Sequence, residues 1–168
     1  AKYGRFDFVW ASPPCTAFSV ASIGHHWNMD RTPKTHLASL NQLLVAYTLN
    51  LINDIKPTYG WLMENPRGML RKLPVVEGLL RRTVTYCTYG DTRMKPTDLW
   101  GELDWTPRQP CKNGMPCHEA APRGSRTGTQ GLKGAKERSR VPYELSQELC
   151  TVVDNHATTL TQRESYPH

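Results

Sequence analysis

The stretch DFVWASPPCTAFSVASIG, residues 7–24, decides the fold, because an apolar run ends there at two prolines and a cysteine. Residues 6–11 (FDFVWA) form a short apolar run bounded by turn-forming residues, a pattern typical of a buried central strand. Pro13 and Pro14 have no backbone N–H with which to continue a strand, so they end it and stiffen the turn that follows. The sequence therefore predicts a strand that presents Cys15 at its carboxyl end.

Outward from this strand, the pattern predicts alternating strands and helices. Residues 12–35 show little periodicity and are interpreted as a loop, while residues 36–54 carry apolar side chains at helical spacing. Pro142 suits the first turn of a last helix. The apolar stripe expected on the first helix is Leu37, Leu40, Leu44, Tyr47 and Leu51, that on the last is Leu145, Leu149, Val152 and Val153, and further strands are expected at residues 59–64, 82–88 and 98–105.

This order of elements predicts an α/β domain with a parallel sheet. At 168 residues, the chain has the length of a single domain. We interpret its segments as a catalytic part (1–103), an irregular basic insertion rich in glycine and proline (104–141), a closing helix (142–154) and a solvated tail (155–168). Because ligands bind outside the carboxyl ends of strands in such sheets, we expect the functional site beside Cys15.

Glu64 is the second unusual residue, because it closes an apolar strand where a carboxylate needs a partner or a raised pKa. Since Cys15 and Glu64 both follow strand ends, we expect them at the same edge of the sheet. A thiolate is a nucleophile, and a carboxyl group shares a proton with a substrate nitrogen, so the pair predicts a nucleophile and an acid facing one pocket. The alternatives are a buried structural cysteine and a glutamate that is merely capped or ion-paired.

The positive charge of the chain is unevenly distributed. The formal net charge is +6 and the pI is about 9.2, which favours nucleic acid as a partner over a merely basic enzyme. Residues 104–141 hold eight lysines and arginines against three acidic residues. Within this segment, Arg123 and Arg126 are predicted to contact DNA phosphates, and Gln130 or Arg126 to read a base edge. The alternative is an unordered, solvated loop.

The same segment contains potential metal ligands. Cys111, Cys117 and His118 cluster there, and Cys87 lies on the preceding predicted strand. Three thiolates and an imidazole suit tetrahedral zinc, although the Cys-x5-Cys-His spacing differs from the common zinc-finger patterns. The odd number of five widely spaced cysteines favours reduced thiols over a disulfide framework, and no apolar run approaches membrane-spanning length. We therefore expect a cytoplasmic protein with no membrane partner.

Four segments resemble, in order and spacing, the motifs of the C5-cytosine DNA methyltransferases. SPPCTAFS is similar to their Pro-Pro-Cys-Gln-x-Phe-Ser motif, with Thr16 in place of the glutamine, and WLMENPRGML is similar to their Glu-Asn-Val motif, with Pro66 in place of the valine. YGDTRMKPTDLWG resembles their Tyr-Gly-x-Pro-Gln-x-Arg-x-Arg motif, with Arg93 kept and Lys95 at the second arginine. RSRVPYELSQELC resembles the helix motif that follows their target-recognition region. The resemblance spans residues 6–150 and is closest to the small, phage-type branch.

The resemblance implies an S-adenosylmethionine-dependent methyltransferase (Rossmann-like) fold, of which this chain supplies the C-terminal part. Cys15 is then expected to attack C6 of a cytosine flipped out of double-stranded DNA, forming a covalent adduct. Glu64 is expected to hold N3 and the exocyclic amine, while Arg93, helped by Lys95, holds the pyrimidine carbonyl. The further contacts that the resemblance implies are Ser19 and Asn65 to substrate DNA and Pro13 and Pro14 to the cofactor.

This family binds S-adenosylmethionine with a glycine-rich loop after its first strand, and no such loop precedes Phe6. We therefore expect the cofactor-binding half in an N-terminal segment outside these residues, or in a subunit that acts in trans, and poor methylation by this chain alone. The alternative is a catalytically inactive DNA-binding or regulatory remnant of the fold. An amino-methyltransferase is less favoured, because Glu64 has no role in that chemistry. If the protein is phage-encoded, its expected location is the cytoplasm of the host.

Overall fold

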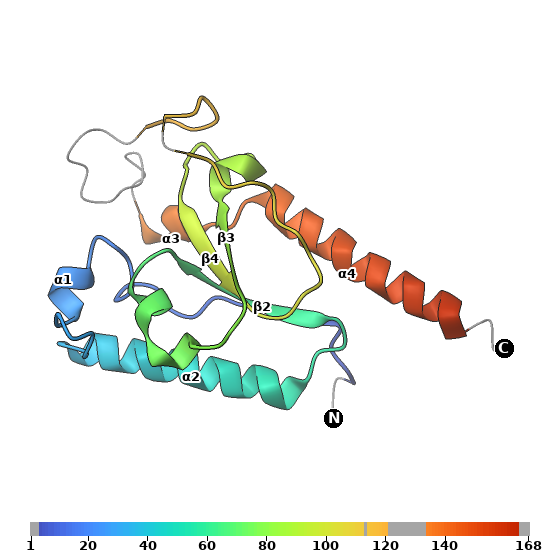
Figure 1. The fold of residues 1–168 in the computed structure, drawn as a ribbon, viewed down its shortest axis with the longest axis horizontal. Helices are drawn as coiled ribbons and strands as arrows, with labels where there is room; N and C mark the ends of the chain where they lie inside the picture. The colour runs from blue at the N-terminus through green and yellow to red at the C-terminus, as the bar shows by residue number, and fades with distance from the viewer. Residues whose placement is uncertain (1–3, 113, 121–133, 165–168) are drawn as a thin grey trace.

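The computed structural model describes residues 4–112, 114–120 and 134–164 and contains a four-stranded sheet between two long helices (Figure 1). The strands are β1 (Phe8–Ala11), β2 (Gly60–Pro66), β3 (Arg81–Thr85) and β4 (Pro96–Trp100), and the long helices are α2 (His36–Ile55) and α4 (Tyr143–Glu164). The short elements are α1 (Ile23–His26), α3 (Ala135–Ser139) and the 3-10 helices η1 (Met69–Lys72), η2 (Pro74–Val76) and η3 (Tyr86–Tyr89). This mixed α/β arrangement is compatible with a methyltransferase-like fold.

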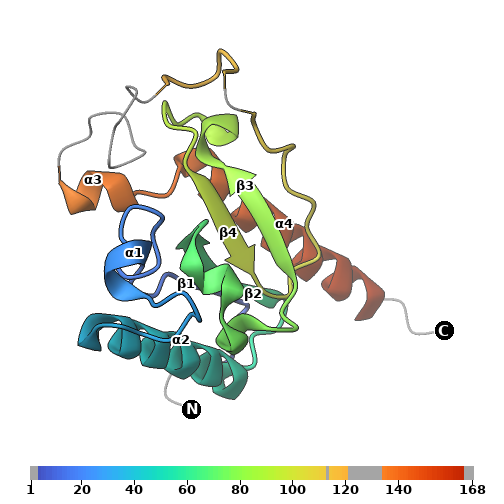
Figure 2. The same cartoon turned by 60° about the vertical axis from the view of Figure 1, so that its left-hand side comes forward.

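The sheet has the strand order β1-β2-β4-β3 and is mixed, so the predicted parallel arrangement is confirmed for β1 and β2 but is wrong for β4 (Figure 2). β1 and β2 are parallel, with Ala11 opposite Met63, while β4 is antiparallel to both β2 and β3. The reason lies in the connection between β3 and β4, which consists only of residues 86–95. Antiparallel neighbours need a short link, whereas a parallel pair needs a longer crossover that usually contains a helix.

Each face of the sheet carries its own core, because successive side chains of a strand point to opposite faces. Met63 and Trp100 pack with the α2 side chains Ala38 and Val45 on one face. On the other face, the neighbouring strand residues Leu62 and Leu99 pack with α4, of which Leu145 and Leu149 are buried and Val152 and Val153 partly buried. The predicted apolar stripe of the last helix is therefore confirmed.

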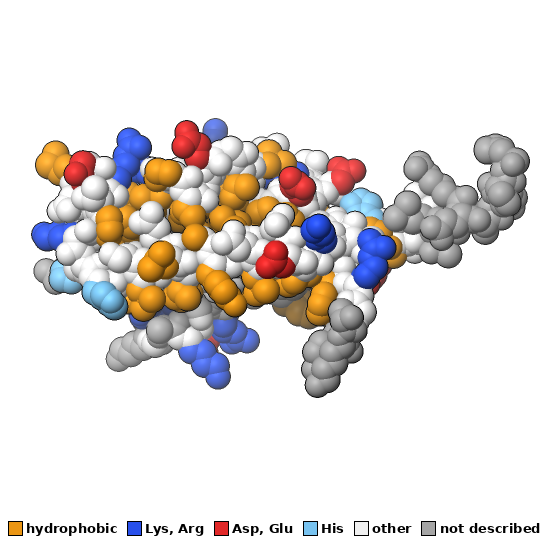
Figure 3. All heavy atoms as spheres, turned by 90° about the horizontal axis from the view of Figure 1, so that it is seen from below, with side chains coloured by type: hydrophobic (Ala, Val, Ile, Leu, Met, Phe, Trp, Pro, Cys, Tyr) orange, Lys and Arg blue, Asp and Glu red, His pale blue; other side chains and the backbone are white. Residues whose placement is uncertain are grey.

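The predicted stripe of α2 is on the wrong face. Leu37, Leu40, Tyr47 and Leu51 are 39–66% exposed, and Leu44 is only half-buried. The side chains that α2 buries against the sheet are Ala38, Asn41, Val45 and Ile52. Both faces of this helix are apolar, so periodicity alone does not tell which face packs, and the smaller side chains allow the closer approach. The outer face leaves a band of apolar side chains over α2 (Figure 3).

Other boundaries also differ from the predictions: β2 continues past Glu64 to Pro66, and the strand expected at residues 98–105 is β4, which ends at Trp100. The third strand ends at Thr85, and residues 86–89 form η3, because the chain turns there into the link to β4. Residues 155–164, predicted as part of a solvated tail, are the last turns of α4. Among the described residues, no helix is long and apolar enough to cross a membrane.

Candidate active site

The carboxyl ends of β1 and β2 bring the predicted nucleophile and acid together. Because Ala11 is opposite Met63 in the parallel pair, the residues that follow, Ser12 and Glu64, are also adjacent. The Ser12 side chain acts on the Glu64 carboxyl group, whose pKa it lowers, and the charge of Glu64 raises the pKa of the Cys15 thiol. The prediction that both residues face the same edge of the sheet therefore agrees with the geometry.

The turn that carries Cys15 is held by the backbone and by two buried aromatic rings. The Cys15 carbonyl accepts the amides of Phe18 and Ser19 at 3.0 and 3.1 Å. Phe18 is fully buried and stacks on Trp27 with ring centroids 5.8 Å apart, while Trp27 Nε1 donates to the Ala17 carbonyl at 2.7 Å. The thiol itself is half-buried. A short turn thus fixes the position of a thiol that solvent still reaches.

The same turn packs directly on the chain that leaves β2. Ser19 and Gly68 form an antiparallel bridge, and the Met69 amide donates to the Phe18 carbonyl at 2.8 Å. A Cβ atom at Gly68 would lie only 2.1 Å from the Phe18 oxygen. Only glycine permits this approach, so Gly68 couples the Cys15 turn to the strand that carries Glu64.

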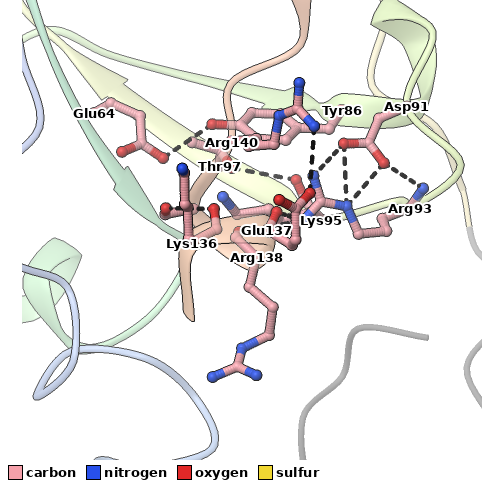
Figure 4. Close-up of polar contacts among 11 residues, drawn as sticks. Glu64, Tyr86, Asp91, Arg93, Lys95, Thr97, Lys136, Glu137, Arg138 and Arg140 are labelled. Carbon is pink, nitrogen blue, oxygen red and sulfur yellow. Dashed lines mark hydrogen bonds and ion pairs between the residues drawn. The ribbon is translucent and has the colours of Figure 1, made fainter. Parts of the chain in front are cut away.

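Glu64 is 6% exposed, and its carboxylate accepts a hydrogen bond from Tyr86 (Figure 4). The phenol of Tyr86 donates to Glu64 Oε1 at 3.0 Å, and the Ser12 side chain also acts on the carboxyl group. Burial raises the pKa of Glu64 above its ordinary value, against the opposing effects of the Lys95 charge, Tyr86 and Ser12. A carboxyl group with a raised pKa is suited to share a proton with a substrate.

Lys95 is the cation of this site. Its ammonium lies 4.4 Å from the centroid of the Tyr86 ring. Burial lowers the pKa of Lys95, while the nearby Glu64 and Cys15 charges oppose that shift. Burial and Glu64 raise the pKa of the Cys15 thiol, and Lys95 lowers it. Cys15, Glu64 and Lys95 therefore form one electrostatically linked group, which we call the thiol–carboxyl–amine triad.

Arg93, the third predicted catalytic residue, is occupied elsewhere. All three nitrogens of its guanidinium donate hydrogen bonds, to the Asp91 carboxylate and to the carbonyls of Glu137 and Arg138 at 3.2 and 3.1 Å (Figure 4). Its side chain is only 4% exposed. Arg93 therefore joins the β3–β4 link to α3, and the structure brings Lys95, not Arg93, to Cys15 and Glu64.

The other residues predicted around the pair have mostly local partners. Asn65 is fully buried and donates from Nδ2 to the Pro13 carbonyl at 3.1 Å, which ties β2 to the proline turn. Asn65 Oδ1 has no partner within the described residues. The Ser19 hydroxyl pairs with Ser22 at 2.9 Å. Pro13 is buried and Pro14 is exposed.

Arg108, near the start of the basic insertion, is held against α4. Arg108 forms ion pairs with Glu144 and Glu148 of α4 at 2.7 and 2.9 Å and stacks over the Tyr89 ring. The charge of Arg108 is therefore paired with glutamates of α4. Arg123, Arg126 and Gln130, which we predicted to contact DNA, lie outside the described residues, so their roles stay predictions.

The four predicted metal ligands lie together. Cys87 of η3 meets Cys111, Cys117 and His118 of the insertion, with all four ligand atoms within 4.8 Å of one another. Cys87 is buried, Cys111 and His118 are half-buried, and Cys117 is exposed. No motif match predicted this convergence, but the residue types did.

Sequence reasoning missed three polar residues of the site. Tyr86 positions Glu64, and it lies on η3, which the sequence predicted as strand. Ser12 directly follows β1, and its side chain lowers the pKa of Glu64. Asp91 binds Arg93, and its place two residues earlier in the same turn was a signal for that ion pair.

Taken together, a half-exposed thiol, a buried carboxyl group and a buried amine at the carboxyl edge of an α/β sheet define a site suited to covalent catalysis. The chain is 30% identical over 164 residues to the "Probable DNA (cytosine-5)-methyltransferase" of Frog virus 3 (isolate Goorha). That match covers 88% of this chain and 76% of the viral protein. No family model matches the chain. The chain belongs to the DNA (cytosine-5)-methyltransferase family.

Proposed function

We propose that this chain carries the base-modifying half of a DNA (cytosine-5)-methyltransferase, with Cys15 as the covalent nucleophile. The observation that carries the proposal is the thiol–carboxyl–amine triad, formed at the sheet edge by residues that occupy the positions of the family's motifs. Membership of the family supports the reaction class. The triad supports the assignment of its steps to particular side chains.

In the first step, the Cys15 thiolate forms a bond to C6 of cytosine. The electrons of the C5–C6 double bond shift to C4–C5, and those of the C4–N3 double bond shift to N3. Glu64 gives its proton to N3, which neutralises the charge that develops on the ring. The raised pKa of Glu64 suits this role, because a larger fraction of the carboxyl group stays protonated before the base arrives. The product is an enamine that is nucleophilic at C5.

Lys95 acts on the thiolate of Cys15 and on the charge that develops on the cytosine ring. Its ammonium lowers the pKa of Cys15, which increases the thiolate fraction, and it lies beside Glu64. We assign to it the stabilisation of the pyrimidine carbonyl oxygen that we had predicted for Arg93. Arg93 then serves as a positioning residue for α3 and for the link that carries Lys95.

The methyl group itself is supplied by S-adenosylmethionine, the cofactor that the family implies. The described residues fit only the edge of such a site, at Pro13 and Pro14, because β1 is followed by the proline turn and not by a glycine-rich loop. We therefore assign no step through the cofactor to the described residues. In the closing step, N3 returns its proton to the Glu64 carboxylate, a base or water removes the C5 proton, the C5–C6 double bond re-forms and the Cys15 thiolate leaves.

The substrate is double-stranded DNA with the target cytosine flipped out, because C6 is not accessible to a thiol within a stacked duplex. We propose that Ser19 and the basic insertion, including Arg123, Arg126 and Gln130, contact the DNA around the flipped base. The net charge of +6 supports this role. We propose that the turn after Cys15 approaches the flipped nucleotide.

The proposal is tested by exchange of C5 tritium from cytosine in DNA, without S-adenosylmethionine. Attack at C6 gives an enamine that takes a solvent proton at C5 and then loses the triton to water, so exchange needs only the triad and a flipped base. We expect tritium release from the unaltered protein and from Cys150→Ser, whose thiol is exposed on α4. Cys15→Ser is expected to release none.

The competing function is a DNA-binding remnant of the fold without catalytic activity. It is favoured by the net raised pKa of Cys15, which keeps most of the resting thiol protonated at neutral pH. Binding of duplex DNA with no tritium release, even after the cofactor-binding half is supplied, would establish the remnant and exclude the enzyme.

A further inference from the structure

We propose that Cys87, Cys111, Cys117 and His118 bind one zinc ion, which fixes the start of the basic insertion to the end of β3. Four ligand atoms from two chain segments converge within 4.8 Å, and three of the residues are thiols. This assignment does not depend on the proposed catalytic function, because none of the four residues belongs to the thiol–carboxyl–amine triad.

Three of the distances between the ligand atoms match tetrahedral coordination, and a fourth is shorter. Zinc–sulfur and zinc–nitrogen bonds of about 2.3 and 2.05 Å at tetrahedral angles place two sulfurs about 3.8 Å apart and a sulfur and a nitrogen about 3.5 Å apart. Cys87 and Cys117 have their sulfurs 3.7 Å apart. His118 Nδ1 lies 3.5 Å from the Cys111 sulfur and 3.7 Å from the Cys117 sulfur. The Cys111–Cys117 pair, at 3.1 Å, is the one that the ion would spread slightly.

The ligand set selects the metal. Three thiolates and one imidazole in a closed four-ligand arrangement are typical of structural zinc, whereas oxygen-rich sites suit magnesium or calcium. All four positions are taken by protein atoms, so no coordination site is left for a substrate. The site is therefore structural.

The surrounding chain explains why an ion is needed there. Among the described residues between 106 and 120 there is no helix or strand, and no side chain is fully buried. The segment runs beside β3 to η3 (Figure 2), and after Arg108, which is ion-paired to α4, it is attached by scattered hydrogen bonds. The Cys111 amide donates to Thr85 Oγ1 at 2.7 Å, and the Glu119 amide to the Thr92 carbonyl at 2.9 Å. A few hydrogen bonds oppose the conformational entropy of such a segment poorly, and a coordinated ion opposes it strongly.

The test is metal analysis of the full chain, purified under reducing conditions without added chelator. We expect about one zinc per chain in the unaltered protein and in the control Cys150→Ser, and loss of most of it in Cys117→Ser and His118→Ala. Cys117 and His118 are not buried, so these changes leave the core intact. A second measurement uses the unaltered protein alone: Co²⁺ in place of zinc should give the visible absorption and thiolate charge-transfer bands of a tetrahedral thiolate site.

The anchoring role has its own readout. Removal of the ion by a chelator is expected to accelerate trypsin cleavage after Lys112, which is exposed and adjacent to Cys111, and re-addition of zinc should restore protection. Equal cleavage with and without zinc would refute the anchoring. Metal-free protein, a stoichiometric metal other than zinc, or a Cys111–Cys117 disulfide in the reduced preparation would each overturn the zinc assignment.

Discussion

The phenol of Tyr86 donates a 3.0 Å hydrogen bond to Glu64 Oε1, which joins η3, the 3-10 helix after β3, to β2 across 22 positions of sequence (Figure 4). Tyr86 is fully buried on η3, so its hydroxyl is fixed. The bond favours the ionised carboxylate and opposes the effect of burial on the pKa of Glu64. Tyr86 therefore acts on the reaction through Glu64, as a positioning residue.

Replacement of Tyr86 by phenylalanine is expected to slow tritium exchange about tenfold, because a hydrogen bond to a charged group contributes about 1.5 kcal/mol or more. It also removes an effect that lowers the pKa of Glu64, so that pKa rises further and the pH profile of exchange moves to higher pH. Tyr47→Phe, at an exposed tyrosine on α2, is the matched control. An unchanged profile in Tyr86→Phe would contradict the coupling.

Glu64→Gln is expected to abolish exchange and yet to make Cys15 more reactive. The Glu64 charge raises the pKa of Cys15, so its removal lowers that pKa and increases the thiolate fraction at pH 8. The measurement is the rate of alkylation at Cys15 by iodoacetamide, resolved from the other cysteines by peptide mass spectrometry. Slower alkylation in Glu64→Gln would show that the two groups do not interact as the structure indicates.

The same variant should be more stable at neutral pH. Burial raises the pKa of Glu64 above its unfolded value, so the folded protein binds the proton more tightly and its stability falls as pH rises from the unfolded pKa through the folded pKa. Glutamine has no proton to lose and still accepts from Tyr86. The Tm of Glu64→Gln should exceed that of the unaltered protein at pH 7 and approach it below the unfolded pKa.

Lys95→Met is expected to change Cys15 in the opposite direction. Its ammonium lowers the pKa of Cys15, so its loss reduces the thiolate fraction and slows alkylation. Tritium exchange should fall about a hundredfold, as is typical when one charge-stabilising donor of an active site is removed. Lys95→Arg keeps the charge and is expected to recover most of the alkylation rate. Equal loss in both variants would indicate a packing defect and not an electrostatic role.

Arg93→Met tests whether Arg93 is structural. The change leaves Asp91 half-buried without its partner, which typically costs about 3–5 kcal/mol of unfolding free energy. The double variant Asp91→Asn/Arg93→Met should recover part of that loss, as measured by urea denaturation. At temperatures well below unfolding, exchange by the double variant should fall less than exchange by Lys95→Met, because Arg93 only positions the link that carries Lys95. A stable double variant without exchange would return Arg93 to the catalytic role that its motif position suggested.

The sequence was sufficient for the part of the site that depends on strand ends. Cys15 follows the end of β1, Glu64 lies near the end of β2, and the pairing of these two strands brings both residues to one edge. The sequence was insufficient where two helix faces or two cationic residues matched the same pattern. α2 is apolar on both sides, so the packed face depends on how closely Ala38 and Val45 approach the sheet. Likewise, the choice between Arg93 and Lys95 depends on which cation Asp91 binds in the turn before β4.

The last prediction concerns the contact between the Cys15 turn and the chain after β2. Gly68→Ala would place a Cβ atom 2.1 Å from the Phe18 carbonyl oxygen, and a backbone atom cannot move aside without shifting the turn. We expect a loss of about 1–3 kcal/mol in unfolding free energy, as is typical for overpacking.

Tritium exchange by Gly68→Ala should fall as well, because the turn that shifts is the one that carries Cys15. Gly24→Ala, in α1, is the matched control, since a Cβ atom there meets nothing within 4 Å. It should leave stability and exchange nearly unchanged. If Gly68→Ala lost stability but exchanged tritium at the normal rate, the position of Cys15 would not depend on this contact, and the coupling between the two strand ends would have to come from the β1–β2 pairing alone.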